Sequence, residues 1–402
     1  MNPPADPPRL LYVADVPVES TCHGSALLFR LLEGYPADRL RVFETNLARS
    51  LPAKRLPRVR YDELTVGSAR PLHSRVARYY RTWLTWRARS AVNQLAASLT
   101  AFQPQAVISV AHGFSWVTAA AFARQRHLPF HLICHDDLTG LEDLPKWAGK
   151  WREAGFSRAY RRAASRFCVS PYMEAAYRRR YGVGGDVLFP SRAANCPDYD
   201  SPPSRLLETC AEPTAVYAGS INSPGYARSI GLLAECLEEV GGRLLVFSPL
   251  DAGDLKRAGL DRPNIENRGL VPFDELIRRC REEADFLYVP MSFEPHDRPN
   301  MELSFPSKLT DYTATGVPLL IRGPAYCSAI RWVSEHPGIA ECVPTEEKSD
   351  LRAAIGRLTG SGARRFEMAG NALTVGREHF SFSSVHEKFL KALRHGGNAG
   401  CA

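Results

Sequence analysis

The chain has 402 residues, enough for two domains, and its 45% hydrophobic and 23% charged residues are typical of a folded globular protein, which excludes disordered and fibrous classes. The formal net charge of +8 indicates acidic partners such as sugar nucleotides or anionic lipid head groups. The ten cysteines include no C-x-x-C pair, which argues against a disulfide framework or a zinc site and favours a reducing cytosol.

The N-terminus MNPPADPP has no apolar core, so we expect no signal peptide. The longest apolar stretch, residues 106–123, is interrupted by Ser109, His112, Gly113 and Ser115. It predicts a strand, a turn and a helix rather than a membrane span.

The first residues predict the start of a Rossmann-like sheet. An apolar run at 9–13 is followed by a polar loop at 15–23, and Gly24 and Ser25 then open an apolar-periodic helix. Such a loop lies at the carboxyl edge of a parallel sheet, where ligands bind. There is no G-x-G-x-x-G, so a dinucleotide site is not supported. For Gly24, a simple tight turn and a ligand contact are both open.

Two histidines follow predicted strands. The apolar runs 106–110 and 130–134 lead directly into His112 and His135. A lone histidine is more often structural than catalytic, but the carboxyl edge of a parallel sheet is where such folds place their chemistry. His135, followed by Asp136, is therefore a candidate catalytic residue, with Asp136 or Asp137 orienting its ring.

The segment 73–89 is basic and aromatic. Its cations are Arg75, Arg78, Arg81, Arg87 and Arg89, and Val76, Tyr80, Trp83 and Arg87 recur at helical spacing. Two interpretations are open: a helix lying on an anionic membrane, or an amphipathic domain helix with a solvated basic face.

Prolines punctuate residues 191–212, which show no clear periodicity and predict an interdomain linker. The alternation then restarts with a strand at 215–218, a loop beginning at Gly219, and a helix over 229–240. Two successive blocks of this kind predict two Rossmann-like domains.

The segment 305–321, FPSKLTDYTATGVPLLI, predicts a short helix that stops at Gly316 before a buried strand. Ser307 is the predicted N-cap. A cation at Lys308 is disfavoured in the first turn unless an anion such as phosphate binds there. Asp311, one turn later, has the reach to bind sugar hydroxyls. A solvated Lys308–Asp311 pair is the alternative.

This segment resembles the signature P-[SN]-K-x-x-E-Y-x-A-x-G-x-P of retaining GT-B glycosyltransferases of the family-4 type (glycosyl transferase group 1). The matching residues are Pro306, Ser307, Lys308, Asp311, Tyr312, Ala314, Gly316 and Pro318, with Asp for the commoner Glu. The resemblance implies an α/β protein of GT-B fold, with two Rossmann-like domains facing a cleft and a C-terminal helix that crosses back to the first domain. It also implies metal-independent hexosyl transfer from a nucleotide sugar, with no cofactor.

The resemblance further implies roles for individual residues. His135 and Asp136 would contact the transferred sugar, and Asp311 the ribose. Ser220 stands where the family has an arginine after glycine, and no lysine follows at the usual interval, so Arg228 or Lys308 would replace that charge. The implied donor-binding set is Gly24, Ser25, Gly219, Ser220, Arg228, Glu294, Ser307, Lys308 and Asp311.

We expect an acceptor-binding domain at 1–198, a donor-binding domain at 199–375 and a returning helix and tail at 376–402. The expected reaction is sugar transfer, with retention, to a glycan or lipid-linked acceptor in polysaccharide or glycoconjugate biosynthesis. The expected location is the cytoplasm, including the inner face of the plasma membrane, without nucleic acid. Two alternatives are open: a sugar-nucleotide epimerase of GT-B fold, and a catalytically silent carbohydrate- or nucleotide-binding protein.

Overall fold

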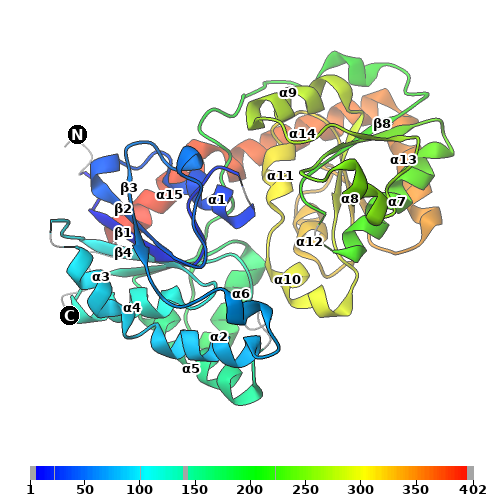
Figure 1. Ribbon diagram of the computed structural model, residues 1–402. Coiled ribbons are helices and arrows are strands. Elements are labelled where there is room, and N and C mark those ends of the chain that lie inside the picture. Colours follow the sequence, from blue (N-terminus) through cyan, green and yellow to red (C-terminus); the bar gives the residue numbers. More distant parts are fainter. Residues whose placement is uncertain (1–5, 22, 100, 139–143, 222, 396–402) are drawn as a thin grey trace. The chain divides into compact units, whose positions relative to one another are not determined.

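The computed structural model describes residues 6–21, 23–99, 101–138, 144–221 and 223–395. The chain forms two compact units (Figure 1). Unit 1 comprises residues 1–194 and 382–402, and unit 2 comprises residues 195–381. Each unit is built around one parallel sheet with helices on both faces.

The sheet of unit 1 has the order β3-β2-β1-β4-β5-β6-β7. The strands are β1 (Leu10–Ala14), β2 (Leu40–Thr45), β3 (Arg60–Leu64), β4 (Ala106–Val110), β5 (Phe130–Cys134), β6 (Ser165–Cys168) and β7 (Asp186–Val187). The central strands are buried along their whole length, as expected of parallel strands covered on both faces. This order places the ends of β1 and β4 at a topological switch point, where ligands of α/β folds bind.

The helices of unit 1 divide between the two faces. They are α1 (His23–Leu32), α2 (Ala77–Arg87), α3 (Ala91–Ser98), α4 (Ser115–Gln125), α5 (Lys146–Arg162), α6 (Pro171–Tyr181) and α15 (Phe382–His395), with 3₁₀ turns at Ala37–Arg39, Pro52–Lys54 and Arg70–His73. Helices α1 and α15 share one core with Tyr12 and Ile108. Because neighbouring strand residues point to opposite faces, α4 packs against the other side of β1, β4 and β5.

Unit 2 repeats the architecture with the strand order β10-β9-β8-β11-β12-β13. The strands are β8 (Thr214–Ala218), β9 (Arg243–Phe247), β10 (Ile265–Asn267), β11 (Phe286–Pro290), β12 (Leu319–Arg322) and β13 (Glu341–Val343). The helices are α7 (Pro224–Glu238), α8 (Ala252–Arg257), α9 (Phe273–Glu283), α10 (Arg298–Leu303), α11 (Ser307–Tyr312), α12 (Ser328–Glu335), α13 (Lys348–Thr359) and α14 (Gly362–Phe380), with 3₁₀ turns at Ser204–Leu207 and Pro295–Asp297.

The last helix belongs to unit 1, although the residues before it belong to unit 2. The Phe389 ring of α15 lies 5.6 Å from that of Phe167. The Ser165 hydroxyl donates to the Ala392 carbonyl over 3.1 Å, and the His386 ring lies 2.9 Å from the Arg30 carbonyl. The terminal helix is thus part of the unit 1 core.

Several local predictions were wrong. Ser307 is not an N-cap: α11 begins at Ser307 itself, and the cap position is Pro306, without a side-chain bond. The helix predicted over 229–240 begins at Pro224, because the Ser223 hydroxyl accepts from the Tyr226 amide.

Candidate functional site

The loop after β8 and the first turn of α11 meet in unit 2. Gly219 has φ +137°, and a Cβ added there would lie 2.7 Å from Cε and 2.8 Å from Nζ of Lys308. No other residue type fits here without moving the lysine. The ammonium group therefore sits directly against exposed backbone, as a phosphate-binding cation beside a glycine loop does.

Lys308 is a half-buried cation that forms no ion pair with any residue the structure describes. Its Nζ lies 5.1 Å from the centre of the Tyr217 ring. Burial lowers the pKa of Lys308 to about 8, while the nearby Asp311 carboxylate raises it. An anion bound at Gly219 would restore the charge that burial disfavours.

Two tyrosines hold this arrangement in place. The Ala218 amide donates to the Tyr312 hydroxyl over 2.6 Å, which ties α11 to the end of β8. The Tyr217 hydroxyl donates to the Ser220 carbonyl over 2.6 Å, which fixes the loop that follows. Tyr312 was part of the sequence signature, but no role could be predicted for it, because its partner lies 94 residues away.

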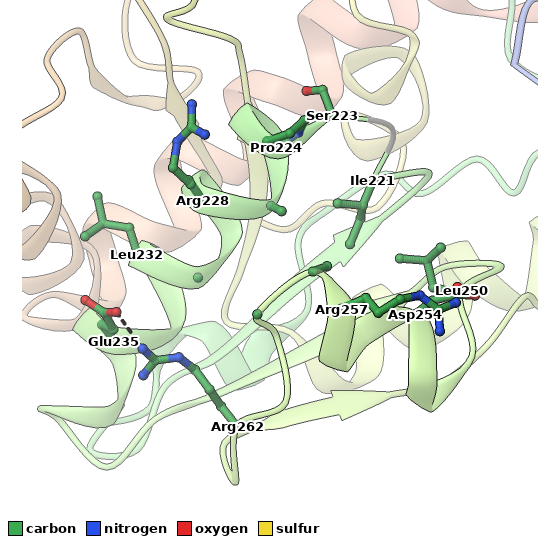
Figure 2. A pocket seen from close by; sticks show the side chains of 14 residues that line it. Ile221, Ser223, Pro224, Arg228, Leu232, Glu235, Leu250, Asp254, Arg257 and Arg262 are labelled. Carbon is green, nitrogen blue, oxygen red and sulfur yellow. Dashed lines mark hydrogen bonds and ion pairs between the residues drawn. The ribbon is translucent and has the colours of Figure 1, made fainter.

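Arg228 is paired with a carboxylate, unlike Lys308 at Gly219. Its guanidinium forms an ion pair with the Glu294 carboxylate, and both side chains are partly exposed. Arg228 also lines a pocket of about 700 Å³ between α7 and α8 (Figure 2), at whose far end Arg262 pairs with Glu235 over 2.5 Å. Of the two cations considered for the missing arginine, Lys308 is therefore the one at Gly219.

His135 directly follows β5 in unit 1 and is half-buried. Burial lowers the pKa of its imidazole, Asp136 raises it, and His112 lowers it further. A neutral ring follows near pH 7, able to donate one hydrogen bond and accept another. His112 and His135 are close enough to interact, as their positions after neighbouring strands predicted.

Asp137 is excluded as the group that orients His135. Its carboxylate accepts from Arg180 Nη1 over 2.8 Å and from the Tyr177 hydroxyl over 3.2 Å, and both partners come from α6. Asp137 is therefore occupied in joining α6 to the end of β5. Asp136 is the remaining candidate for this role.

A residue that sequence reasoning missed fixes the loop after β4. The buried Asp15 carboxylate accepts from the Phe114 amide over 2.7 Å, and from the amide and hydroxyl of Ser115 over 2.6 and 2.8 Å. It caps α4, although burial raises its pKa. Gly113, with φ +59°, is required because a Cβ there would lie 2.5 Å from Asp15 Oδ2.

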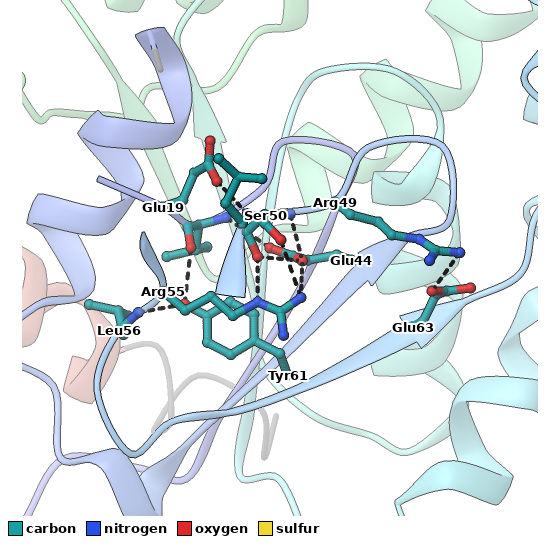
Figure 3. Close-up of polar contacts among 10 residues, drawn as sticks. Glu19, Glu44, Arg49, Ser50, Arg55, Leu56, Tyr61 and Glu63 are labelled. Atoms are coloured by element: carbon teal, nitrogen blue, oxygen red, sulfur yellow. Dashed lines mark hydrogen bonds and ion pairs between the residues drawn. The ribbon is translucent and has the colours of Figure 1, made fainter. Parts of the chain in front are cut away.

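A buried carboxylate network holds the loop after β1 (Figure 3). Glu44 accepts from the Val18 amide over 3.1 Å and from the amide and hydroxyl of Ser50 over 3.1 and 2.8 Å. Glu19 accepts from the Leu51 amide over 2.6 Å. These bonds explain why a polar loop at this edge is ordered before α1.

Gly24 and Ser25 lie in the first turn of α1, and Ser25 is buried. A Cβ at Gly24 would meet its nearest neighbour, Val16, at 3.7 Å, which is ordinary contact. Within unit 1, a side chain would therefore fit at position 24, whereas none fits at Gly219.

Within the described part of the chain, no group of three or more His, Cys, Asp or Glu side chains is arranged to hold a metal ion. In the same residues, no helix is long and apolar enough to cross a bilayer.

Comparison with known proteins finds similarity to glycosyltransferases in part of the sequence and in the fold. Residues 53–188 match the family model Glycosyltransferase Family 4. The fold resembles sucrose-phosphate synthase from Thermosynechococcus elongatus (TM-score 0.67, 14% identity, covering 97% of this chain and 99% of that one). It also resembles Anabaena HepE in complex with UDP-glucose (TM-score 0.65, 14% identity, 96% and 99%). A third is the trehalose 6-phosphate synthase of Burkholderia multivorans (TM-score 0.61, 13% identity, 98% and 97%).

No curated protein sequence matches the chain. The predicted GT-B fold is confirmed, and so is the resemblance to family-4 glycosyltransferases.

Proposed function

We propose that this chain, which has the GT-B fold and a segment that matches Glycosyltransferase Family 4, is a glycosyltransferase that uses a nucleotide-diphosphate sugar. The observation that carries the proposal is the Lys308 ammonium held against Gly219. Burial disfavours the charge of Lys308 more than the Asp311 carboxylate favours it, so a bound anion would stabilise this lysine. HepE, solved with UDP-glucose, supports a sugar nucleotide as that anion.

The donor lies on unit 2 in this proposal. Lys308 and the loop at Gly219 and Ser220 bind the diphosphate, and Asp311 binds the ribose hydroxyls. Ser307 contributes the first amide of α11. Glu294 contacts the sugar or the phosphate only after releasing Arg228, so we assign that pair a secondary role.

The chemistry we propose is hexosyl transfer with retention of configuration and without a metal. The bond between the sugar C1 and the diphosphate oxygen breaks, and the acceptor oxygen forms a bond to C1 from the same face. The acceptor proton passes to an oxygen of the leaving diphosphate. The protein contributes placement and charge stabilisation: Lys308 for the diphosphate, and His135, oriented by Asp136, for a sugar hydroxyl.

The acceptor we propose is a glycan or a lipid-linked sugar in polysaccharide or glycoconjugate biosynthesis, met in the cytoplasm or at the inner face of the plasma membrane. Unit 1, with its excess of positive charge, supports an acidic acceptor or surface.

One observation favours a second candidate, a catalytically silent nucleotide-binding protein. Ser220 brings no cation to the loop where the family has an arginine, so Lys308 carries the charge alone. With fewer cations beside it, the negative charge that develops on the leaving diphosphate is stabilised less, and cleavage of the bond to the sugar is slower.

Thermal-shift screening with nucleotides and nucleotide sugars tests binding, because a ligand of the folded state raises the melting temperature. Incubation of the stabilising nucleotide sugar with the protein then tests catalysis through release of free nucleotide. Stabilisation with release supports the transferase, and stabilisation without release, with and without acceptor sugars, supports the silent protein. No stabilisation by any nucleotide would contradict both.

A further inference from the structure

A groove between α4 and α5 of unit 1 is lined by cations. Its volume is about 1140 Å³, and its floor is made of small residues such as Ala120, Ala159 and Ala163. The cations that line it include Arg89, Arg124, Arg158, Arg161, Arg162 and Arg166. No acidic side chain of the described residues lines it. Arginine is the side chain best suited to binding phosphate, because its planar fork donates two parallel hydrogen bonds.

The arginines of the groove other than Arg152 form no ion pair with a residue that the structure describes. Arg166 donates to the backbone carbonyls of Tyr160, Gly184 and Arg161, over 2.8 to 3.3 Å. Arg89 lies over the Trp151 ring, 5.6 Å from its centre. The exposed Arg124, Arg158, Arg161 and Arg162 form no ion pair with a described residue, whereas most exposed arginines of unit 2 do.

Helix dipoles explain only some of the arginines that line the groove. A cation in the last turn is favoured by the negative end of the helix, which explains Arg124 in α4 and Arg161 and Arg162 in α5. It does not explain Arg158, which precedes the last turn of α5, or Arg166, which lies in β6.

Charge is divided unequally along the chain. Between Glu63 and Asp136 there is no acidic residue. Unit 1 carries 31 Lys and Arg against 16 Asp and Glu, whereas unit 2 carries 20 against 27. The positive charge of the protein is therefore a property of unit 1, and it is concentrated in the part that contains the groove.

Helix α2 adds an exposed apolar face beside the groove. Its residues Thr85 and Arg89, the latter just past its end, line the groove. The aromatic stripe of α2, which we define as Val76, Tyr79, Trp83 and Trp86, is 55%, 57%, 38% and 65% exposed. Spacings of three and four residues put these side chains on one face. Tyr80 stacks on Trp83 with ring centroids 5.3 Å apart, and the Arg87 guanidinium lies 5.0 Å from the centre of the Trp83 ring, so these three side chains share one side of α2 as predicted. Tyr80 itself is half-buried, and its hydroxyl accepts from the Ser68 amide over 2.7 Å.

We propose that unit 1 docks on a bilayer of anionic phospholipid, with lipid phosphates in the arginine groove and the aromatic stripe of α2 among the head groups. Exposed tryptophan and tyrosine beside unpaired cations are typical of helices that lie at a membrane interface. Trp147, at the start of α5, is also 65% exposed. This proposal rests on the proposed function in one respect: the membrane is where the protein would meet a lipid-linked acceptor. The docking itself is measured without any sugar.

The role of the arginines in membrane binding is tested by sedimentation with phosphatidylcholine vesicles, with and without phosphatidylglycerol, at low and high salt. We expect binding only with phosphatidylglycerol, and loss of binding at high salt. The variant Arg124→Gln/Arg158→Gln/Arg162→Gln should partition roughly a hundredfold less at low salt, since each near-surface cation contributes several-fold.

A matched control removes the same charge elsewhere. Lys54→Gln/Lys388→Gln/Arg394→Gln also loses three exposed cations of unit 1, two of them from α15 on the opposite face of the sheet. We expect this control to bind nearly as the wild type does. An equal loss in both triple variants, or no wild-type binding to phosphatidylglycerol, would overturn the proposal. Tighter binding to heparin or an oligonucleotide than to the vesicles would also overturn it, in favour of a soluble polyanion.

The insertion part is tested with Trp83→Phe/Trp86→Phe, which keeps aromatic volume. Vesicles of brominated phosphatidylglycerol should quench the wild-type tryptophan fluorescence, and the double variant should lose most of that quenching while still sedimenting. Unchanged quenching would show that the stripe does not reach the bilayer. UDP titration of the wild type separates the two proposals. No vesicle binding with measurable UDP affinity contradicts docking alone, and vesicle binding without UDP affinity contradicts the proposed function alone.

Discussion

His131 shows how one buried side chain makes the stability of unit 1 depend on pH. It lies in β5, fully buried, and its two ring nitrogens have no partner among the described residues. Burial lowers the pKa of His131 to about 4, against about 6.5 in an unfolded chain. The unfolded state therefore binds more protons between these values. The stability this group contributes is full above about pH 6.5 and is lost as the pH falls towards 4.

We predict that the wild type loses up to about 3 kcal/mol of unfolding free energy through this group as the pH falls from about 7 to about 4. The variant His131→Leu should lose less over the same range, because it has no proton to take up. Urea unfolding of both proteins at several pH values measures the difference. Parallel pH dependences for the two proteins would assign the acid sensitivity to other groups.

Lys308 makes nucleotide binding depend on pH at the alkaline end of the range. With a pKa of about 8 in the free protein, it is charged below that pH and progressively neutral above it. A bound diphosphate favours the charged form, so binding above about pH 8 must take up a proton. We predict that UDP affinity is flat below about pH 8 and falls by up to about tenfold per pH unit above it. Titration calorimetry from neutral to alkaline pH checks this, and a flat profile would mean that Lys308 does not meet the phosphates.

At the scale of elements, α11 combines three predicted site residues in one short helix. Ser307, Lys308 and Asp311 are all half-buried, and Tyr312 anchors the helix to the end of β8. Their separation along one turn and a half is sufficient to reach phosphate and ribose together. The helix thus acts as a unit, and its two functions are separable by mutation.

We predict that Asp311→Ala weakens binding of UDP or GDP while leaving inorganic pyrophosphate almost unaffected, because only the nucleotides carry a ribose. Competition between each ligand and a fluorescent nucleotide gives the three affinities. Asp311→Asn is the matched control, since it keeps the volume and one acceptor. Equal losses for nucleotides and pyrophosphate would show that the mutation had disturbed α11.

The elements that the sequence predicted best are apolar strands buried on both faces. The predicted runs 106–110 and 130–134 coincide with β4 and β5, and the predicted run 215–218 lies within β8. Strand β3 was missed because its sequence, RYDEL, is mostly charged and its place at the sheet edge leaves it partly exposed. Continuous hydrophobicity predicts central strands, but an edge strand depends on its neighbour for its existence.

The candidate site was predictable in its parts but not in its contacts. Gly219 and Lys308 were both named from the sequence, but their contact joins residues 89 positions apart in the chain. The cap that Asp15 forms on Ser115 was missed for the same reason, because the partners lie 100 residues apart. Local patterns indicate which residue types are available; only the sheet order determines which of them meet.

At the scale of the whole molecule, the two units divide the proposed work: donor binding on unit 2, and contact with the transferred sugar and the acceptor on unit 1. We predict that His135→Ala lowers turnover about a hundredfold, as loss of one positioned donor does, and leaves UDP affinity unchanged. Steady-state transfer rates and a UDP titration give the two numbers. His112→Ala is a useful comparison, since His112 interacts with His135 without being assigned a substrate contact. Near-normal turnover of the His135→Ala enzyme would make the histidine structural.

The central claim is that Lys308, held against Gly219, binds the diphosphate of a nucleotide sugar. Its most direct test is calorimetric titration of UDP and GDP into the wild type and Lys308→Met at neutral pH. For the nucleotide that the wild type binds, we predict a loss of about 1.5–3 kcal/mol of binding free energy, the range for a hydrogen bond to a charged group. Ligand-free stability should be unchanged or slightly higher, because a buried charge has been removed. Equal affinity of the two proteins for that nucleotide would contradict the account.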